Sequence, residues 1–87
     1  MNLQQLRYAV EVAKTGSITA AAKNLYMGQP NLSKSIRELE AELGITLFER
    51  TARGVAPTKN GEDFLGYARS IIAQMESLET MFGPHTE

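Results

Sequence analysis

The chain has 87 residues, of which 43% are hydrophobic and 22% charged, with no cysteine and one histidine. This length supports one small hydrophobic core, and the composition is that of a folded protein and not of a disordered one. The lack of cysteine excludes disulfides, thiolate metal sites and cysteine nucleophiles. The sequence contains no run of about 18 apolar residues, which a membrane-spanning helix would need. We therefore expect a soluble, cytoplasmic protein that is not an enzyme and holds no metal or cofactor in this segment.

The formal net charge of −1 is unevenly distributed along the chain. Residues 23–59 carry six cations and four carboxylates, whereas residues 60–87 carry one cation and five carboxylates. Phosphate contacts respond to the local potential and not to the net charge. The basic middle of the chain is therefore compatible with nucleic-acid binding, although this asymmetry alone does not argue for it.

Two amphipathic helices are predicted in the first third of the chain. Apolar residues recur at helical spacing up to Ala13, which predicts a helix to about Lys14 that stops at Gly16. Ser17 then stands at the N-cap position of a short helix, whose small alanine face allows close approach of another helix. The two apolar stripes consist of Leu3, Leu6, Ala9, Val10 and Ala13, followed by Ile18, Ala21, Ala22 and Leu25.

A third helix is predicted after a tight turn. Gly28 gives the turn backbone freedom, and Pro30 suits the first turn of a helix because its missing N–H has no partner there. The buried stripe of this helix consists of Leu32, Ile36, Leu39 and Leu43, and Gly44 ends it. A short helix, a tight turn and a second helix that opens with small polar and basic residues are typical of a helix-turn-helix.

Two short strands are predicted next, over residues 45–50 and 55–57, around a turn at residues 51–54. They would form a small β-wing. Arg50 on this wing could contact DNA, but we expect it to pair with a carboxylate such as Glu40 and hold the wing against the third helix.

The last predicted helix runs from residue 58 to residue 82. Thr58 is its expected N-cap, with an incomplete capping box because Gly61 occupies the third helical position. A helix of this length would be about 37 Å long, which outreaches a small core. Its heptad-like seam predicts pairing with a second copy of the chain, parallel or antiparallel, through Phe64, Ala68, Ile71, Met75, Leu78 and Phe82.

The start of the third helix carries chemistry that suits the major groove of DNA. Gln29 can pair with adenine, Ser33 can donate or accept, and Lys34 can reach guanine acceptors or phosphate. Pro30 can touch a thymine methyl, and Asn31 completes this base-reading set. The alternative is that these residues only cap and solubilise an exposed helix end.

The chain resembles the amino-terminal domain of LysR-type transcriptional regulators in three runs of sequence. These runs are Ser17-Ile18-Thr19-Ala20-Ala21-Ala22-Lys23-Asn24-Leu25, Gln29-Pro30-Asn31-Leu32-Ser33-Lys34-Ser35-Ile36-Arg37-Glu38-Leu39-Glu40, and Leu43-Gly44-Ile45-Thr46-Leu47-Phe48-Glu49-Arg50. The resemblance implies a mainly α winged helix-turn-helix domain, a three-helix core with a short two-stranded wing, followed by a long dimerisation helix that pairs antiparallel. Gln29, Pro30, Ser33 and Lys34 match the family's groove-facing positions, and Arg53 matches its basic wing tip. Gly28 stands where the family more often has Ser or Thr.

The resemblance divides the chain into a DNA-binding domain at 1–57, a linker helix at 58–82, and a flexible tail or start of a hinge at 83–87. It implies that an effector-binding domain for a small molecule is missing, and we expect the chain to be cut within the hinge. The expected partners are double-stranded operator DNA in the bacterial nucleoid and a second copy of the chain. For a full-length protein, a tetramer is an alternative assembly. Further contacts to the DNA backbone or minor groove are expected from Ser17, Lys23, Arg37, Arg53, Thr58 and Lys59.

A second function class is a dimeric adaptor that binds proteins through its long helix and does not read DNA. The face of the third helix discriminates the two, because an adaptor would tolerate acidic or bulky apolar groups there. This helix opens with Gln, Asn, Ser and Lys, and Glu38, Glu40 and Glu42 are confined to its far end. The charge polarity favours DNA binding.

Overall fold

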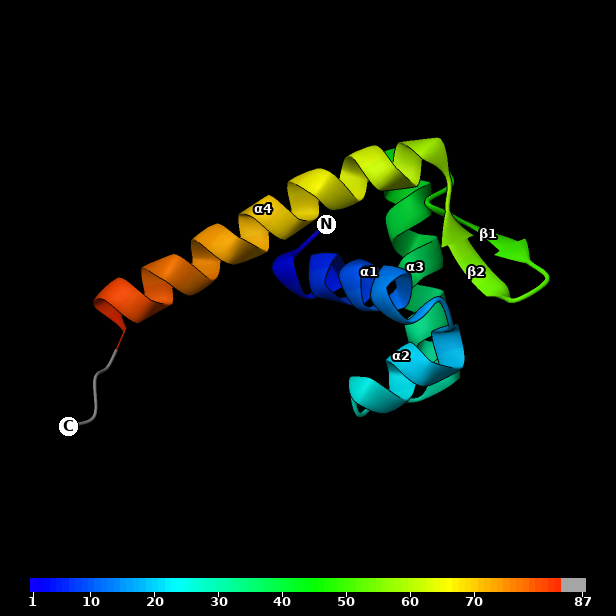
Figure 1. Cartoon of the computed structure of the whole chain (residues 1–87), viewed down its shortest axis with the longest axis horizontal. Coiled ribbons are helices and arrows are strands. Elements are labelled where there is room, and N and C mark those ends of the chain that lie inside the picture. The colour runs from blue at the N-terminus through cyan, green and yellow to red at the C-terminus, as the bar shows by residue number, and fades with distance from the viewer. Residues whose placement is uncertain (84–87) are drawn as a thin grey trace.

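A computed structural model describes residues 1–83 of the chain, so the tail predicted at 83–87 lies outside the described residues beyond Gly83. The element order is α1 (Leu3–Thr15), α2 (Ile18–Asn24), α3 (Gln29–Leu43), β1 (Phe48–Thr51), β2 (Gly54–Pro57) and α4 (Lys59–Phe82). Helices α1 to α3 pack together, the hairpin extends to one side, and α4 crosses α1 and projects beyond the rest (Figure 1). This confirms the predicted winged helix-turn-helix with a long final helix.

The helix ends follow from local capping chemistry. At α1, the Asn2 side chain accepts from the Gln5 N–H at 2.8 Å while the Gln5 side chain accepts from the Asn2 N–H at 3.2 Å, a capping box that the sequence analysis did not find. The Ser17 Oγ accepts from the Ala20 N–H at 3.1 Å and starts α2, as predicted. Gly16 and Gly44 end α1 and α3 in the left-handed conformation, at φ 68° and 70°.

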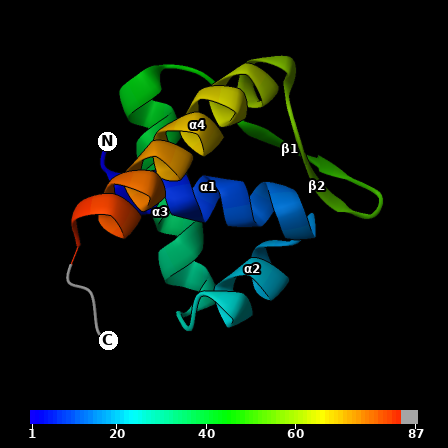
Figure 2. The ribbon, with the colours of Figure 1, turned by 60° about the vertical axis from the view of Figure 1, so that its left-hand side comes forward.

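The core lies where α1, α2, α3 and the start of α4 converge (Figure 2). The predicted apolar stripes of α2 and α3 are confirmed. Their buried members are Ala21 and Ala22 on α2, and Leu32, Ile36 and Leu39 on α3. On α1, the buried face is Leu6, Ala9 and Val12, while Val10 and Ala13 are half-buried. Val10 and Ala13 pack against the core, so the predicted α1 stripe is confirmed, and Val12 widens it because α2, α3 and α4 all pack on this helix. Leu47 and Leu65 complete the core.

The wing is a two-stranded antiparallel sheet in which Phe48 pairs with Pro57 and Thr51 with Gly54. The prediction that its first strand begins at residue 45 is wrong. The Glu40 carboxylate accepts from the N–H groups of Leu47 and Phe48, at 2.7 and 3.3 Å, and the Leu47 carbonyl accepts from the Thr58 N–H. These bonds hold the segment before Phe48 against α3 and α4 instead of in the sheet.

Candidate nucleic-acid interface

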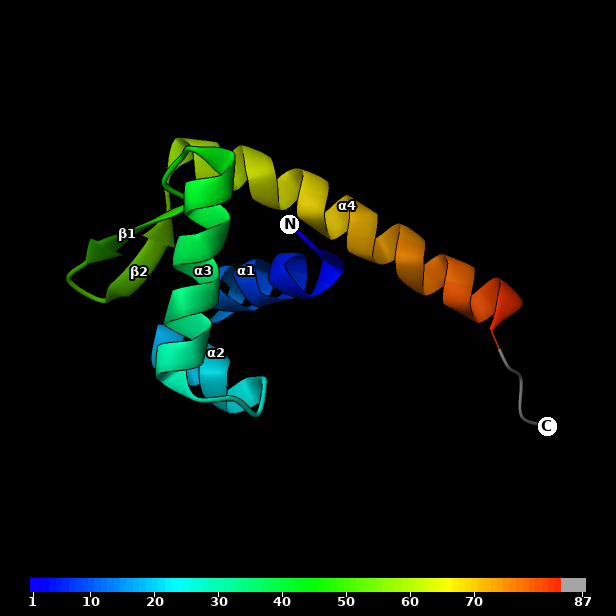
Figure 3. The same cartoon turned by 180° about the vertical axis from the view of Figure 1, so that it is seen from behind.

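The start of α3 is an uncapped, exposed helix end. Its N-cap is Gly28, which has no side chain to bond the free N–H groups of the first turn, and no neighbouring side chain takes that role. Gln29 therefore does not cap the helix. The alternative that the polar residues at the start of α3 serve only to cap and solubilise it is wrong in its first part. Seen from behind, α3 stands in front of the other helices with no element over its outer face (Figure 3).

The five predicted base-reading residues lie together on this end of α3. Four are exposed and Ser33 is half-buried; the exposed ones are Gln29, Pro30, Asn31 and Lys34. Within residues 1–83, no hydrogen bond or ion pair engages the side chains of Gln29, Asn31, Ser33 or Lys34. Their donors and acceptors are available to a ligand.

The wing is held against the corner between α1 and α2. The Val55 N–H donates to the Gly16 carbonyl at 3.0 Å. At Gly54, with φ 136°, a Cβ would lie 2.3 Å from the same carbonyl oxygen, so only glycine fits this contact. The clamp fixes the hairpin, and with it the exposed Arg53, relative to the helix-turn-helix.

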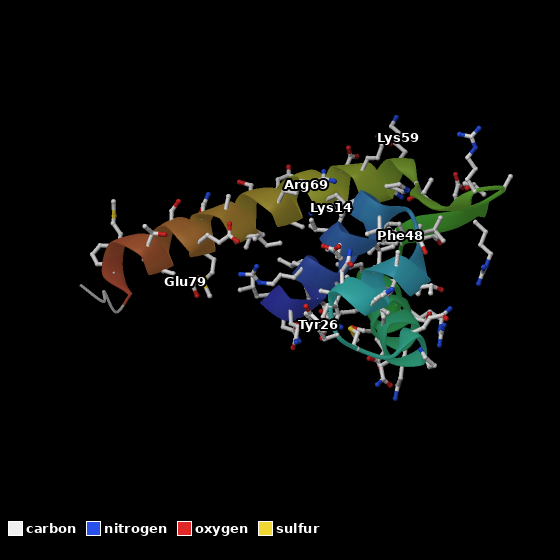
Figure 4. The ribbon with its side chains drawn as sticks, turned by 60° about the horizontal axis from the view of Figure 1, so that its bottom comes forward. Lys14, Tyr26, Phe48, Lys59, Arg69 and Glu79 are labelled. Atoms are coloured by element: carbon white, nitrogen blue, oxygen red, sulfur yellow. The ribbon has the colours of Figure 1, made fainter. Side chains whose placement is uncertain are left out.

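The structure changes the predicted set of backbone contacts at one position. Lys23, Arg37, Arg53 and Lys59 are exposed, and Lys59 points away from the body of the domain (Figure 4). Ser17 is half-buried and caps α2 through its oxygen, which leaves its proton free. The Thr58 hydroxyl donates its one proton to the Thr46 carbonyl at 2.5 Å and accepts from the Gly61 N–H at 2.9 Å. Thr58 has no proton left for a phosphate, so we remove it from the set.

The expected pairing of Arg50 with Glu40 is also wrong. Glu40 uses its carboxylate on backbone N–H groups of the segment before the wing, as described above. The two ion pairs within the described part of the chain join the Met1 ammonium to Glu42 and Arg7 to Glu76, so Arg50 takes part in neither. Its side chain is exposed on β1 and makes no ion pair or hydrogen bond within residues 1–83.

The outer face of α4 carries large apolar side chains that no other part of residues 1–83 covers. Tyr67, Ile71, Leu78, Met81 and Phe82 are 48–77% exposed. The predicted seam is corrected at Ala68, which is 1% exposed and packs in the chain's own core because α4 turns this face towards α1. Of the other seam residues, Phe64 and Met75 are half-buried.

Metal-binding groups and membrane-spanning helices were both sought within residues 1–83. These residues contain no group of three His, Cys, Asp or Glu side chains that could hold a metal ion. No helix in the same part of the chain is long and apolar enough to span a membrane.

The architecture and sequence both match known proteins. The family model described as "Bacterial regulatory helix-turn-helix protein, lysR family" matches residues 3–62. The chain belongs to the LysR family. The HTH-type transcriptional regulator ClcR of Pseudomonas putida is 47% identical over 72 residues, which are 83% of this chain and 24% of ClcR. The chain thus spans about a quarter of the length of such relatives.

Two solved structures are similar over nearly the whole chain. The BenM DNA-binding domain in complex with benA site 1 DNA has a TM-score of 0.89 and 42% identity, over 93% of this chain and 91% of that one. The CbnR DNA-binding domain in complex with DNA has a TM-score of 0.87 and 38% identity, over 93% of each chain. These similarities cover the helix-turn-helix, the wing and most of α4.

In this LysR-family domain, Tyr26 lies beside the candidate interface and was not among the predicted site residues. Tyr26, in the turn before α3, has φ 56° and is 96% exposed (Figure 4). A tyrosine in the left-handed region costs about 1–2 kcal/mol, and no packing offsets this cost. Composition and periodicity give no signal for such a residue.

Replacing Tyr26 by Asn is expected to stabilise the fold by about 0.5–1 kcal/mol, because Asn adopts the left-handed conformation more readily and little buried surface is lost. Urea denaturation at fixed protein concentration measures the effect. Tyr26→Phe keeps the same backbone penalty and should match the original protein. A Tyr26→Asn variant that is less stable than Tyr26→Phe would show that the aromatic ring stabilises the turn.

Proposed function

We propose that this chain is the DNA-reading part of a bacterial transcriptional regulator and binds double-stranded operator DNA with the start of α3 in the major groove. The observation that carries the proposal is the exposed end of α3. This helix end has no side-chain cap, and its amide, hydroxyl and ammonium side-chain groups make no hydrogen bond or ion pair within residues 1–83. Ser33 shares a groove with the wing, whose turn carries Arg53. The major groove is the DNA surface where such groups can distinguish base pairs, and Arg suits narrow minor grooves. The DNA complexes of the similar BenM and CbnR domains support the same function.

We infer that the chain acts as a homodimer joined through the outer face of α4. Exposed apolar patches of this kind mark interaction sites, and α4 extends well beyond the core. A second copy presents the same face and can cover it, and the family resemblance favours an antiparallel arrangement. A dimer would present two α3 helices to two half-sites.

A protein adaptor that uses α4 without reading DNA is the second candidate, since the apolar face of α4 alone would serve either role. The polar, unbonded start of α3 favours DNA. The names of the similar proteins, which are those of transcriptional regulators, support a regulator and not an enzyme. We further propose a cytoplasmic location at the nucleoid, a small-molecule effector bound by a domain beyond this segment, and a tetramer as one assembly of the full-length protein.

Gln29→Ala tests the reading surface. Loss of a bidentate adenine contact should weaken binding to the cognate site by about 1–3 kcal/mol, which is roughly 5- to 150-fold, and leave binding to a random duplex unchanged. Fluorescence anisotropy at one fixed salt concentration measures both, on a site first obtained by selection from random sequences. Because Gln29 does not cap α3, circular dichroism should show an unchanged fold.

Lys59→Ala is the matched comparison for this experiment. A contact to the phosphate backbone carries no sequence information, so this change should weaken cognate and random DNA by the same factor. If Gln29→Ala also weakens both equally while folding normally, the start of α3 anchors DNA and does not read it. If selection yields no bound sequence, the adaptor function is favoured.

A further inference from the structure

One asparagine of the chain stands directly before a glycine, at Asn60 and Gly61. The other asparagines, Asn2, Asn24 and Asn31, are each followed by leucine. Asparagine is chemically labile, because the backbone nitrogen of the next residue can attack its side-chain amide carbon. A branched side chain on that next residue hinders the attack, whereas glycine does not. Asn60 is therefore the asparagine of this chain that is most prone to deamidation.

The fold imposes the glycine at this position. Gly61 is buried in the first turn of α4, and a Cβ there would lie 2.0 Å from the Leu47 carbonyl oxygen. The Asn60 side chain is exposed and makes no hydrogen bond or ion pair within residues 1–83. Packing thus fixes the residue that leaves the attack unhindered, and solvent water reaches the amide.

The attacking nitrogen is held by the helix cap. The Thr58 side-chain oxygen accepts from the Gly61 N–H at 2.9 Å, and the Thr58 hydroxyl donates to the Thr46 carbonyl at 2.5 Å. A backbone N–H in such a hydrogen bond gives up its proton less readily, and the helix restricts the approach of the nitrogen to the amide carbon. Attack on the Asn60 amide therefore requires local opening of the first turn of α4.

We propose that Asn60 is a modification site, which deamidates when the first turn of α4 opens. The Gly61 nitrogen loses its proton and bonds to the Asn60 side-chain carbon. The bond from that carbon to its amide nitrogen breaks, and the nitrogen leaves with the proton as ammonia. The succinimide ring that forms takes up one water molecule and opens to aspartate or isoaspartate. Because the ammonia is lost, the chain does not return to asparagine.

The product carries a new charge beside a predicted DNA contact. Each modified copy gains a carboxylate next to Lys59, which is exposed and points away from the body of the domain (Figure 4). In the first turn of α4 an aspartate interacts favourably with the helix dipole, so it preserves the fold. The same carboxylate repels phosphates and weakens binding of every DNA sequence alike. This consequence rests on the proposed function, whereas the deamidation does not.

The rate of deamidation tests the proposal. The folded chain, the chain unfolded in guanidinium chloride, and the variants Thr58→Ala and Thr58→Ser are incubated at mildly alkaline pH. Pepsin digestion in acid, chromatography and mass spectrometry then measure conversion at residue 60. The unfolded chain should react fastest and the folded chain slowest. In the same digests, Asn31 reports an exposed asparagine that precedes leucine, and it should react far more slowly than Asn60 in the unfolded chain.

The two variants at Thr58 isolate the cap. Thr58→Ala should deamidate roughly 2- to 30-fold faster than the original folded chain, because this is the increase in opening that loss of an N-cap produces. Thr58→Ser keeps a capping hydroxyl and should match the original chain. Thermal unfolding shows whether Thr58→Ala folds. If it does not, the comparison of the folded with the unfolded original chain decides alone.

Three results would overturn the proposal: a folded chain that reacts as fast as the unfolded one, a folded Thr58→Ala variant no faster than Thr58→Ser, or equal conversion at Asn31 and Asn60 in the unfolded chain. The first two would show that the cap does not control the reaction. The third would show that the glycine does not promote it. None of these results depends on DNA.

Asn60→Asp reproduces the aspartate product, and Asn60→Gln is its uncharged control. Fluorescence anisotropy should show that Asn60→Asp binds the selected operator and a random duplex more weakly than Asn60→Gln by the same factor, about 2- to 10-fold. Thermal unfolding should show that its stability is not lowered. Equal DNA binding by the two variants would overturn the consequence for DNA, while the rates above decide the modification. Failure of the original protein to bind either duplex would instead overturn DNA binding itself.

Discussion

Gly61→Ala is expected to destabilise the fold by about 3 kcal/mol, at the upper end of what overpacking in a core costs. A Cβ at residue 61 would lie 2.0 Å from the Leu47 carbonyl oxygen and 2.9 Å from its carbonyl carbon. That carbonyl is fixed, because it accepts from the Thr58 N–H and Leu47 is fully buried. The start of α4 would have to move away from the core, and the Thr58 cap would be lost.

The opposite result is expected at Gly66 in the same helix. A Cβ there meets nothing within 4 Å, and the residue is exposed. Because alanine favours a helix over glycine by about 0.5–1 kcal/mol, Gly66→Ala should stabilise the chain by that amount. Urea denaturation of both variants, with the oligomeric state checked by sedimentation, measures the pair. Equal effects of the two changes would show that the close approach of Gly61 to Leu47 is not present in solution.

Gly61 also illustrates which features the sequence could predict. Thr58 and the acidic residues after it predicted the start of α4, and the structure confirms that start within one residue. From the sequence alone, Gly61 is only the missing partner of a capping box. Its packing role depends on Leu47, which lies in the loop between α3 and β1, so no local pattern around Gly61 reports it.

The predicted elements succeeded where the signal was local. Caps at Ser17, Gly16 and Gly44 and the 3–4 spacing of apolar residues are properties of neighbouring residues, and they placed the helices correctly. The first strand of the wing was extended too far because Ile45 and Leu47 look like strand residues. The long-range bond from Leu47 to Glu40 withdraws that segment from the sheet.

The functional surfaces were predicted in outline only. The polar start of α3 could be identified from residue types, but the absence of a side-chain cap and the free state of Arg50 depend on tertiary contacts. On α4, two apolar stripes run one residue apart: Leu65 and Ile72 accompany Phe64 and Ile71 along the helix. Periodicity cannot say which stripe faces the core. The structure assigns Leu65, Ala68 and the half-buried Ile72 to it and leaves Ile71 outside.

This assignment determines how dimerisation should be tested. Met75 is half-buried, so changing it would also disturb the chain's own packing. Ile71 and Leu78 are 48% and 54% exposed and lie seven residues apart on the outer face of α4. We therefore expect Ile71→Glu with Leu78→Glu to give a folded monomer by sedimentation, because a carboxylate buried between two helices would lose its hydration without a partner.

The same double variant should lose at least about 100-fold in operator affinity, because two linked half-site contacts commonly gain 10²–10⁴ over one. The added carboxylates also repel DNA, so the control must carry the same charge. Ser70→Glu with Ser77→Glu provides it, since both serines are exposed and lie about 100° further round the helix at the same seven-residue spacing. This control should remain dimeric and bind operator nearly as the original protein does.

A double variant at Ile71 and Leu78 that stays dimeric would show that another face joins the copies. One that becomes monomeric yet keeps full operator affinity would show that a single copy accounts for operator binding and that the α4 pairing serves something other than DNA binding.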